Sequence, residues 1–146
     1  MTHDSHLPLG SRVAIVTGAS SGIGLAIAER LVALGCRTVI NARRAELLRE
    51  VAARLDNQSL ARAPIPRVLP VHGDAAEQDV IDRLFVAAES PETGASCGFG
   101  APVDLVVINA GRGLSGSVAT SDPSQWEEMV RTNLLGAARL MRTAAE

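Results

Sequence analysis

The chain has 146 residues and a formal net charge of −2. All 14 basic residues are arginines, and the sequence contains neither lysine nor tyrosine. These absences exclude a lysine Schiff base, a phosphate-binding lysine of the Walker type and a phenolic acid, and the excess of acidic residues argues against a nucleic-acid partner.

The length predicts a single domain over residues 1–146. No apolar stretch reaches the roughly 18 residues that span a bilayer, and the N-terminus does not read as a secretory signal. Residues 1–10 are expected to be disordered, and the HxxH spacing of His3 and His6 there is a poor metal motif. Cys36 and Cys97 lack CxxC or metal-type spacing, so we interpret them as packing residues of a cytoplasmic protein.

Strands and helices alternate along the sequence. Short β-branched runs predict strands at residues 12–17, 37–41, 67–72 and 103–109. Apolar residues at helical spacing predict three helices between them, marked by the sets Ile23, Ile27, Leu31, Leu34, then Leu47, Leu48, Val51, Leu55, then Val80, Ile81, Leu84, Phe85, Ala88. Gly35 closes the first helix. The alternation predicts an α/β fold, a Rossmann-like doubly wound parallel sheet.

Prolines and glycines mark the irregular segments. Residues 56–66 are predicted to be a loop because of Pro64 and Pro66, and Pro70 places the third strand at a sheet edge. Residues 90–102 are expected to be a surface insertion. The fourth strand is apolar enough to be covered on both faces.

The last helix has a clear start. Asp122 is a good N-cap, Pro123 suits the first helical position, and Gln125 completes a capping-box pattern. An apolar stripe then follows: Trp126, Val130, Asn133, Ala137, Leu140, Ala144. Asn133 is its polar member, and a buried amide there would be either a structural clasp, which we favour, or a site residue.

A glycine-rich turn, Thr17 to Gly24, joins the first strand to the first helix. Glycines here allow close approach of a pyrophosphate to the helix N-terminus, whose free N–H groups favour anions. The spacing is GxxxGxG, because Ile27 stands where the third glycine of the usual dinucleotide motif would be. The alternative is a plain helix-capping turn.

The end of the second strand indicates which dinucleotide is preferred. Folds that prefer NAD place an acidic residue there for the ribose 2′-OH, whereas an arginine accommodates a 2′-phosphate. The sequence here is Asn41-Ala42-Arg43-Arg44, and residues 37–67 are net basic. Arg43 and Arg44 therefore favour NADP(H) over NAD(H), with a solvated helix start as the alternative.

Two further strand ends carry polar groups toward the same crevice. The candidate cofactor-binding residues there are Asp74 and Ala75 after the third strand and Asn109, Ala110 and Gly111 after the fourth. Asp74 could accept a hydrogen bond from an adenine amino group, or cap a helix beginning near Ala75, or do both. Asn109 is predicted to brace the glycine loop, and Gly111, after Ala110, to let the backbone approach the cofactor; an ordinary turn is the alternative. We interpret His72 as a packing residue and see no catalytic partners for Ser115 or Ser117.

Together these residues resemble the short-chain dehydrogenase/reductase family. The resemblance implies that the TGASSGIG loop contacts the pyrophosphate and ribose through Gly18, Ser20, Ser21, Gly22, Ile23 and Gly24. It makes Arg43 the arginine of NADP-preferring members, at a site where Ala42 replaces the acid of NAD-preferring ones. Asp74 matches the adenine-binding acid. Asn133 matches the asparagine that holds a water of the proton relay and interrupts its helix.

The sequence departs from the family in one large respect. Family members run to about 250 residues and place a serine, a tyrosine and a lysine beyond this asparagine. A sheet of order 3-2-1-4 would also leave Leu105–Ile108 at an exposed edge, which natural proteins avoid. We therefore expect an N-terminal cofactor-binding part of a reductase acting on a small carbonyl or alcohol, which the family resemblance makes a homodimer or homotetramer when complete. The alternatives are a non-catalytic NADP(H)-binding module and an inactive gene fragment.

Overall fold

A computed structural model of the chain describes residues 9–58, 66–91, 98–114, 116–117 and 119–146. The expectations for His3, His6, Pro64, Cys97 and Ser115 fall outside these residues. The elements are η1 (Leu9–Ser11), β1 (Val13–Val16), α1 (Gly22–Ala33), β2 (Arg37–Ala42), α2 (Ala45–Gln58), β3 (Val68–His72), α3 (Gln78–Glu89), β4 (Leu105–Val107), α4 (Pro123–Val130), η2 (Arg131–Gly136) and α5 (Ala137–Ala145). The predicted alternation of strands and helices is confirmed.

The four strands form one parallel sheet in the order β3-β2-β1-β4. β1 is central and fully buried, and Ile15 lies between Val39 of β2 and Val106 of β4. Pro70 lies in the edge strand β3, opposite Ile40, as predicted. The doubly wound α/β fold is therefore confirmed.

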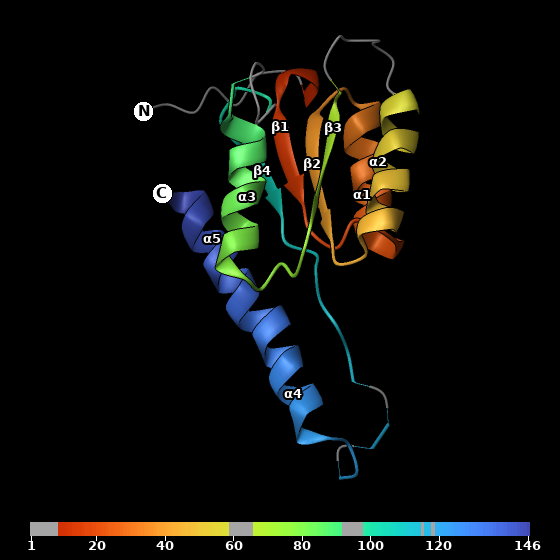
Figure 1. Ribbon diagram of the computed structural model, residues 1–146, viewed down its shortest axis with the longest axis vertical. Coiled ribbons are helices and arrows are strands. Elements are labelled where there is room, and N and C mark those ends of the chain that lie inside the picture. The colour runs from red at the N-terminus through yellow and green to blue at the C-terminus, as the bar shows by residue number, and fades with distance from the viewer. Residues whose placement is uncertain (1–8, 59–65, 92–97, 115, 118) are drawn as a thin grey trace.

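Helices cover both faces of the sheet (Figure 1), with α1 and α2 on one face and α3 and α5 on the other. Alternate residues of β1 supply the two halves of the core, because successive strand side chains point to opposite faces. Ala14 and Val16 pack in the cluster that includes α1 and α2, and Val13 and Ile15 pack with α3 and Leu140 of α5. Gly35, at φ +90°, ends α1 as predicted.

The fourth strand is shorter and less covered than its apolar sequence suggested. It spans Leu105–Val107 and pairs with β1 alone among the described strands. Leu105 is 38% exposed and Ile108 is 36% exposed. The expectation of cover on both faces was wrong, whereas the position of these residues at a sheet edge is confirmed.

Two other expectations about burial were wrong, and one apolar residue of the first helix is exposed. Phe99 of the expected surface insertion is only 2% exposed, because it fills the core beside α3. His72 is exposed rather than packed, since its side chain alternates with that of buried Val71. Ile23 is 74% exposed although it shares the helical spacing of buried Leu31, because it lies in the first turn of α1.

The N-terminal segment differs in part from the expected disorder. Leu9 to Ser11 form the short 3-10 helix η1, whose carbonyl oxygen at Leu9 accepts a hydrogen bond from the Cys36 thiol at 2.9 Å. Cys36 is buried, as predicted for a packing residue.

The last three helical elements run on continuously; α4 projects beyond the carboxyl ends of the strands, whereas α5 lies beside α3 (Figure 1). Asp122 caps α4 as predicted, since its side chain accepts from the Ser124 backbone N–H at 2.9 Å. The middle segment, η2, is a π-helix that contains Asn133. Within the described ranges, no helix is both long and apolar enough to cross a membrane.

Candidate functional site

The loop after β1 leaves a helix N-terminus without a side-chain cap. Gly18 and Gly22 adopt left-handed backbone conformations, with φ values of +66° and +59°. Ser21 stands at the N-cap position of the 12-residue helix α1 but forms no capping hydrogen bond through its side chain. Among the described residues, Ser21 therefore does not supply the side-chain partner that a capping turn would give the first-turn N–H groups, and an anion is a natural ligand for such groups.

The loop is held in place by a hydrogen-bond cluster between Thr17 and the end of β4. The Thr17 hydroxyl accepts from the backbone N–H groups of Asn109 and Ala110, each at 3.0 Å. The Asn109 amide donates to the carbonyl oxygens of Thr17 at 3.1 Å and Gly18 at 3.3 Å. The predicted role of Asn109 as a brace for the loop is confirmed.

Gly24 makes this close packing possible. A Cβ atom at Gly24 would lie 2.4 Å from both the Gly18 carbonyl oxygen and the Asn109 amide nitrogen. A methyl group at this position would displace the Gly18 backbone, so the helix can approach the loop this closely only with glycine here.

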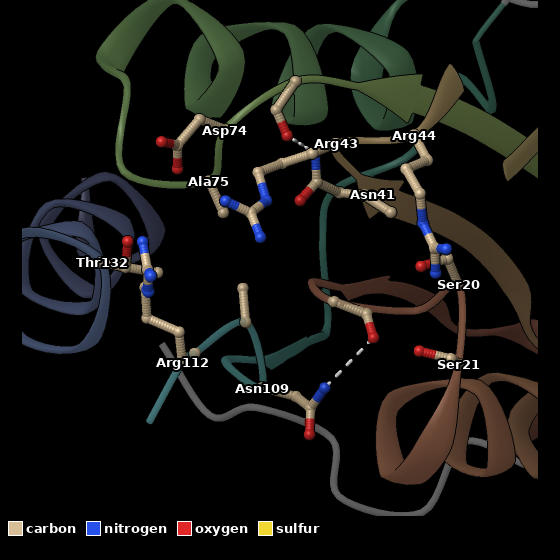
Figure 2. Close-up of a pocket in the computed structure, with 15 residues that line it drawn as sticks. Ser20, Ser21, Asn41, Arg43, Arg44, Asp74, Ala75, Asn109, Arg112 and Thr132 are labelled. Atoms are coloured by element: carbon tan, nitrogen blue, oxygen red, sulfur yellow. Dashed lines mark hydrogen bonds between the residues drawn. The ribbon is translucent and has the colours of Figure 1, made fainter. Parts of the chain in front are cut away.

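These elements surround a cavity of about 640 Å³ at the carboxyl edge of the sheet, a size typical of sites for small molecules and cofactors. Figure 2 shows Ser20 and Ser21 on one side, Asp74 and Ala75 above, and Thr132 with Arg112 opposite the serines. Ten of the predicted site residues line the cavity: Gly18, Ser20, Ser21, Arg43, Arg44, Asp74, Ala75, Asn109, Ala110 and Gly111.

The end of β2 brings two arginines to the cavity. The Arg43 side chain points into it, and that of Arg44 extends toward Ser20 (Figure 2). Both are exposed, and within the described part of the chain neither forms a salt bridge. Two cations without an acidic partner at a cavity wall give a positive potential that favours an anionic ligand group.

Asn41 fixes the neighbouring strand end. It is 1% exposed, and its side-chain amide donates to the carbonyl oxygens of Val71 at 2.9 Å and Gly73 at 3.2 Å. The turn that carries Asp74 is thereby tied to the turn that carries Arg43. Asn41 was not among the residues we predicted, although a buried polar residue ending an apolar strand is a signal that could have found it.

Asp74 caps a turn rather than a helix. Its Oδ1 atom accepts from the Ala76 N–H at 2.9 Å, and α3 begins only at Gln78, after Glu77. The expected helix start near Ala75 was therefore wrong, because this turn comes first. The carboxylate still lines the cavity, so the capping and ligand-binding interpretations of Asp74 are compatible.

Asn133 acts as a clasp. Its Oδ1 atom accepts from the Arg112 N–H at 2.9 Å, and its amide donates to the Arg112 carbonyl oxygen at 2.8 Å. Gly111 lies beside it, since a Cβ there would be 3.2 Å from Asn133 Oδ1. The clasp interpretation is confirmed, but Asn133 is exposed rather than buried, because the π-helical segment around it projects past the sheet.

Four of the predicted site residues do not line the cavity: Gly22, Ile23, Gly24 and Asn133. Gly24 shapes the cavity indirectly, because it lets α1 approach the loop that contains Gly18. Asn133 does so by holding the backbone of Arg112. Besides Asn41 and Ala42, the cavity walls include Gly73, Arg112 and Thr132, which sequence reasoning missed. Gly73 directly precedes Asp74 and Thr132 directly precedes Asn133, so extending each motif by one residue would have included them.

The Arg112 side chain pairs with Glu128 of α4 and is 28% exposed. Among the described residues, no group of three or more His, Cys, Asp or Glu could hold a metal ion. The cavity wall therefore combines the loop that precedes α1, an arginine pair and one carboxylate, and these groups fit the phosphates and the base of a dinucleotide.

Comparisons with known proteins agree with this geometry. Residues 12–146 match the family model described as short chain dehydrogenase. The NADP-dependent (R)-specific alcohol dehydrogenase of Lentilactobacillus kefiri is 34% identical over 128 residues, covering 88% of this chain and 45% of that protein.

Two solved structures share the fold. L-sorbose reductase from Gluconobacter frateurii, complexed with NADPH and L-sorbose, gives a TM-score of 0.75 at 32% identity, over 93% of this chain and 48% of that one. A variant of actinorhodin polyketide ketoreductase with NADPH gives a TM-score of 0.78 at 33% identity, over 94% of this chain and 48% of that one. The chain spans about half the length of the curated relatives it matches. The match over residues 12–146, together with the strand order and the glycine loop, shows that the chain belongs to the short-chain dehydrogenase/reductase family.

Proposed function

We propose that the chain binds NADP(H) in this cavity, in preference to NAD(H). The observation that carries the proposal is the pair Arg43 and Arg44 at the cavity wall, next to Ala42, where an NAD-preferring site would place an acid. A ribose 2′-phosphate beside these guanidinium groups forms charge-assisted hydrogen bonds that NAD(H) cannot offer.

The other residues divide along the dinucleotide. The loop from Gly18 to Gly24, with the hydroxyls of Ser20 and Ser21 and the backbone of Ile23, holds the pyrophosphate at the start of α1. Asp74 and Ala75 bind the adenine. Asn109, Ala110 and Gly111 support the central part of the cofactor from the end of β4. When bound, the nicotinamide supplies the hydride chemistry, and the protein orients it.

The complete protein, in this proposal, is an NADP(H)-dependent oxidoreductase acting on CH–OH groups, by carbonyl reduction or alcohol oxidation. Its named relatives include an NADP-dependent alcohol dehydrogenase and structures with bound NADPH. The family resemblance gives Asn133 a place in the proton relay and makes the complete protein dimeric or tetrameric, and the spacing of the two cysteines favours a cytoplasmic protein. The exposed apolar side chains of Val130, Leu134 and Met141 on the last helices support such an assembly.

A second candidate function rests on composition. The 146-residue sequence has no tyrosine and no lysine, the residues that complete the family's catalytic set. We therefore expect the chain by itself to bind NADP(H) without turnover, as a non-catalytic module. Carbonyl reductase activity from this polypeptide alone would contradict that expectation.

The proposal is tested by titrating NADPH and NADH separately into the 146-residue chain, following nicotinamide fluorescence or the heat of binding. We expect saturable binding of both, with NADPH the tighter ligand by about ten-fold or more, the worth of one charge-assisted contact. Equal affinity would refute the preference for NADP(H), and no binding of either would refute the proposed site.

A further inference from the structure

The helical segment after the fourth strand lies directly against the turn that carries Asp74. A Cβ atom at Gly136 would be 2.9 Å from the Ala76 Cα atom and 3.3 Å from the Ala75 carbonyl oxygen. Glycine at this position lets the helix backbone approach the turn at a distance that no side chain would allow. The turn is thus bounded by β3 on one side and by η2 and α5 on the other.

Two arginines of this segment hold the turn. Arg139 of α5 donates from Nη1 to the Ala76 carbonyl oxygen at 2.6 Å. Arg131, the first residue of η2, forms an ion pair with Glu77 and places Nη1 at 3.7 Å from Asp74 Oδ2. One arginine therefore fixes the backbone of the turn, and the other faces its carboxylates.

The contacts of Asp74 leave its carboxylate oriented but open. Oδ1 accepts from the Ala76 N–H, and Oδ2 faces the Arg131 guanidinium, so both oxygens are engaged from the side of the turn. The Asp74 side chain is still 26% exposed and lines the cavity. A carboxylate held at two points presents its remaining lone pairs in a fixed direction, which is the requirement for selective recognition of a hydrogen-bond donor.

We propose that Arg131 is a positioning residue for adenine recognition: it orients the Asp74 carboxylate toward the 6-amino group of the cofactor's adenine. This inference rests on the proposed function, because it requires a dinucleotide in the cavity. It also links the adenine end of the cavity to η2, the segment that holds Arg112 through Asn133. Glu77 also forms an ion pair with Arg131, but it does not line the cavity, so we assign it no contact with the adenine.

The test compares NADPH with the analogue in which hypoxanthine replaces adenine. The analogue carries a 6-oxo acceptor in place of the 6-amino donor and a proton on N1, so the ratio of the two dissociation constants reports how strongly the chain prefers a hydrogen-bond donor at position 6 of the base. We expect the unmodified chain to prefer NADPH by about three- to ten-fold, the worth of one hydrogen bond. Arg131→Gln should bring this ratio close to one, as should Asp74→Asn.

Two variants separate positioning from a general structural effect. Arg142→Gln removes an arginine of the same helical segment that pairs only with Glu146 among the described residues, and should leave the ratio unchanged. Glu77→Gln removes the other partner of Arg131 while leaving Asp74 and Arg131 together, and should also keep the ratio. If Arg131 merely stabilised the fold, Glu77→Gln would instead reproduce the effect of Arg131→Gln.

The outcomes are distinct. A ratio that is unchanged in Arg131→Gln, or lost in Glu77→Gln, would overturn the positioning role while leaving NADPH binding intact. An unmodified chain that does not distinguish adenine from hypoxanthine would also overturn it. Failure of the unmodified chain to bind NADPH at all would refute the proposed function, and this inference with it.

Discussion

The hydroxyl of Thr17 and the side-chain amide of Asn109 join two strand ends that are about 90 residues apart in the sequence. Asn109 donates to the Thr17 carbonyl oxygen at 3.1 Å, and the Thr17 hydroxyl accepts from the Asn109 backbone N–H at 3.0 Å. The glycine loop is thereby locked to the end of β4, at the place where the strand order of the sheet reverses. A ligand site at that reversal is a general property of doubly wound sheets.

Thr17→Val tests this relationship. The substitution keeps the shape of a fully buried side chain but removes the acceptor of two backbone N–H groups, those of Asn109 and Ala110. We expect the free energy of unfolding, measured by urea denaturation, to fall by about 2 kcal/mol or more, because the two donors lose their partner.

Thr38→Val is the matched control. Thr38 is equally buried in β2, but its hydroxyl has no hydrogen-bond partner within the described residues. Removing an unpaired buried hydroxyl should be neutral or stabilising. Equal losses of stability in the two variants would mean that the Thr17 hydroxyl has no special role.

Gly24→Ala should disrupt the loop. The new methyl group would lie 2.4 Å from the Gly18 carbonyl oxygen, so the loop must move. We expect a loss of about 1–3 kcal/mol in unfolding free energy, the usual effect of overpacking, together with weaker NADPH binding in a fluorescence titration. Gly113→Ala, which meets no atom within 4 Å, should leave both quantities unchanged. A Gly24→Ala chain that binds NADPH normally would contradict the proposed fit of the loop.

The composition of the chain makes the contribution of one cysteine to the pH dependence of stability easy to isolate. Burial raises the pKa of the Cys36 thiol above its ordinary value of 9.0. The folded state therefore keeps the thiol proton that the unfolded chain releases, so this contribution to stability is present below pH 9 and is lost as the pH rises through the folded pKa. Lysine and tyrosine, which would titrate in the same range, are absent from the chain.

A Cys97→Ser chain, in which Cys36 is the remaining thiol, should lose unfolding free energy above pH 9, by up to about 1.4 kcal/mol per pH unit. Adding Cys36→Ala should remove the pH dependence. A decline of equal slope in the double variant would assign the effect to another group.

Local patterns were enough to predict the strands, the helices and most of the cavity. Pro70 placed its strand at the edge, and Gly35 marked a helix end, because each residue constrains its own backbone. The ends of parallel strands meet at one edge, so the residues that follow them, such as Arg43 and Asp74, could be assigned to one site from the order of strands and helices alone.

Features that depend on tertiary packing were not predictable in this way. Phe99 lies in a segment of loop-like composition, yet it is buried because it packs in the core cluster with residues of α3. Asn133 was expected to face the core from its helical spacing, but the π-helical turn changes that spacing and leaves the side chain exposed. Nor does any local signal show that Arg131 reaches Asp74, 57 positions earlier, because that contact depends on Gly136 packing against Ala76.

The most direct test of the central claim is the ratio of NADH to NADPH dissociation constants in Arg43→Ala, compared with the unmodified chain. Arg49→Ala, an exposed arginine of α2 that pairs with Glu46 and does not line the cavity, is the matched control. We predict that Arg43→Ala weakens NADPH binding by about ten-fold or more and leaves NADH binding nearly unchanged, because only NADPH carries the 2′-phosphate. The ratio should stay constant in Arg49→Ala. An unchanged ratio in Arg43→Ala would show that Arg43 does not bind the 2′-phosphate and would contradict the assignment of this cavity to NADP(H).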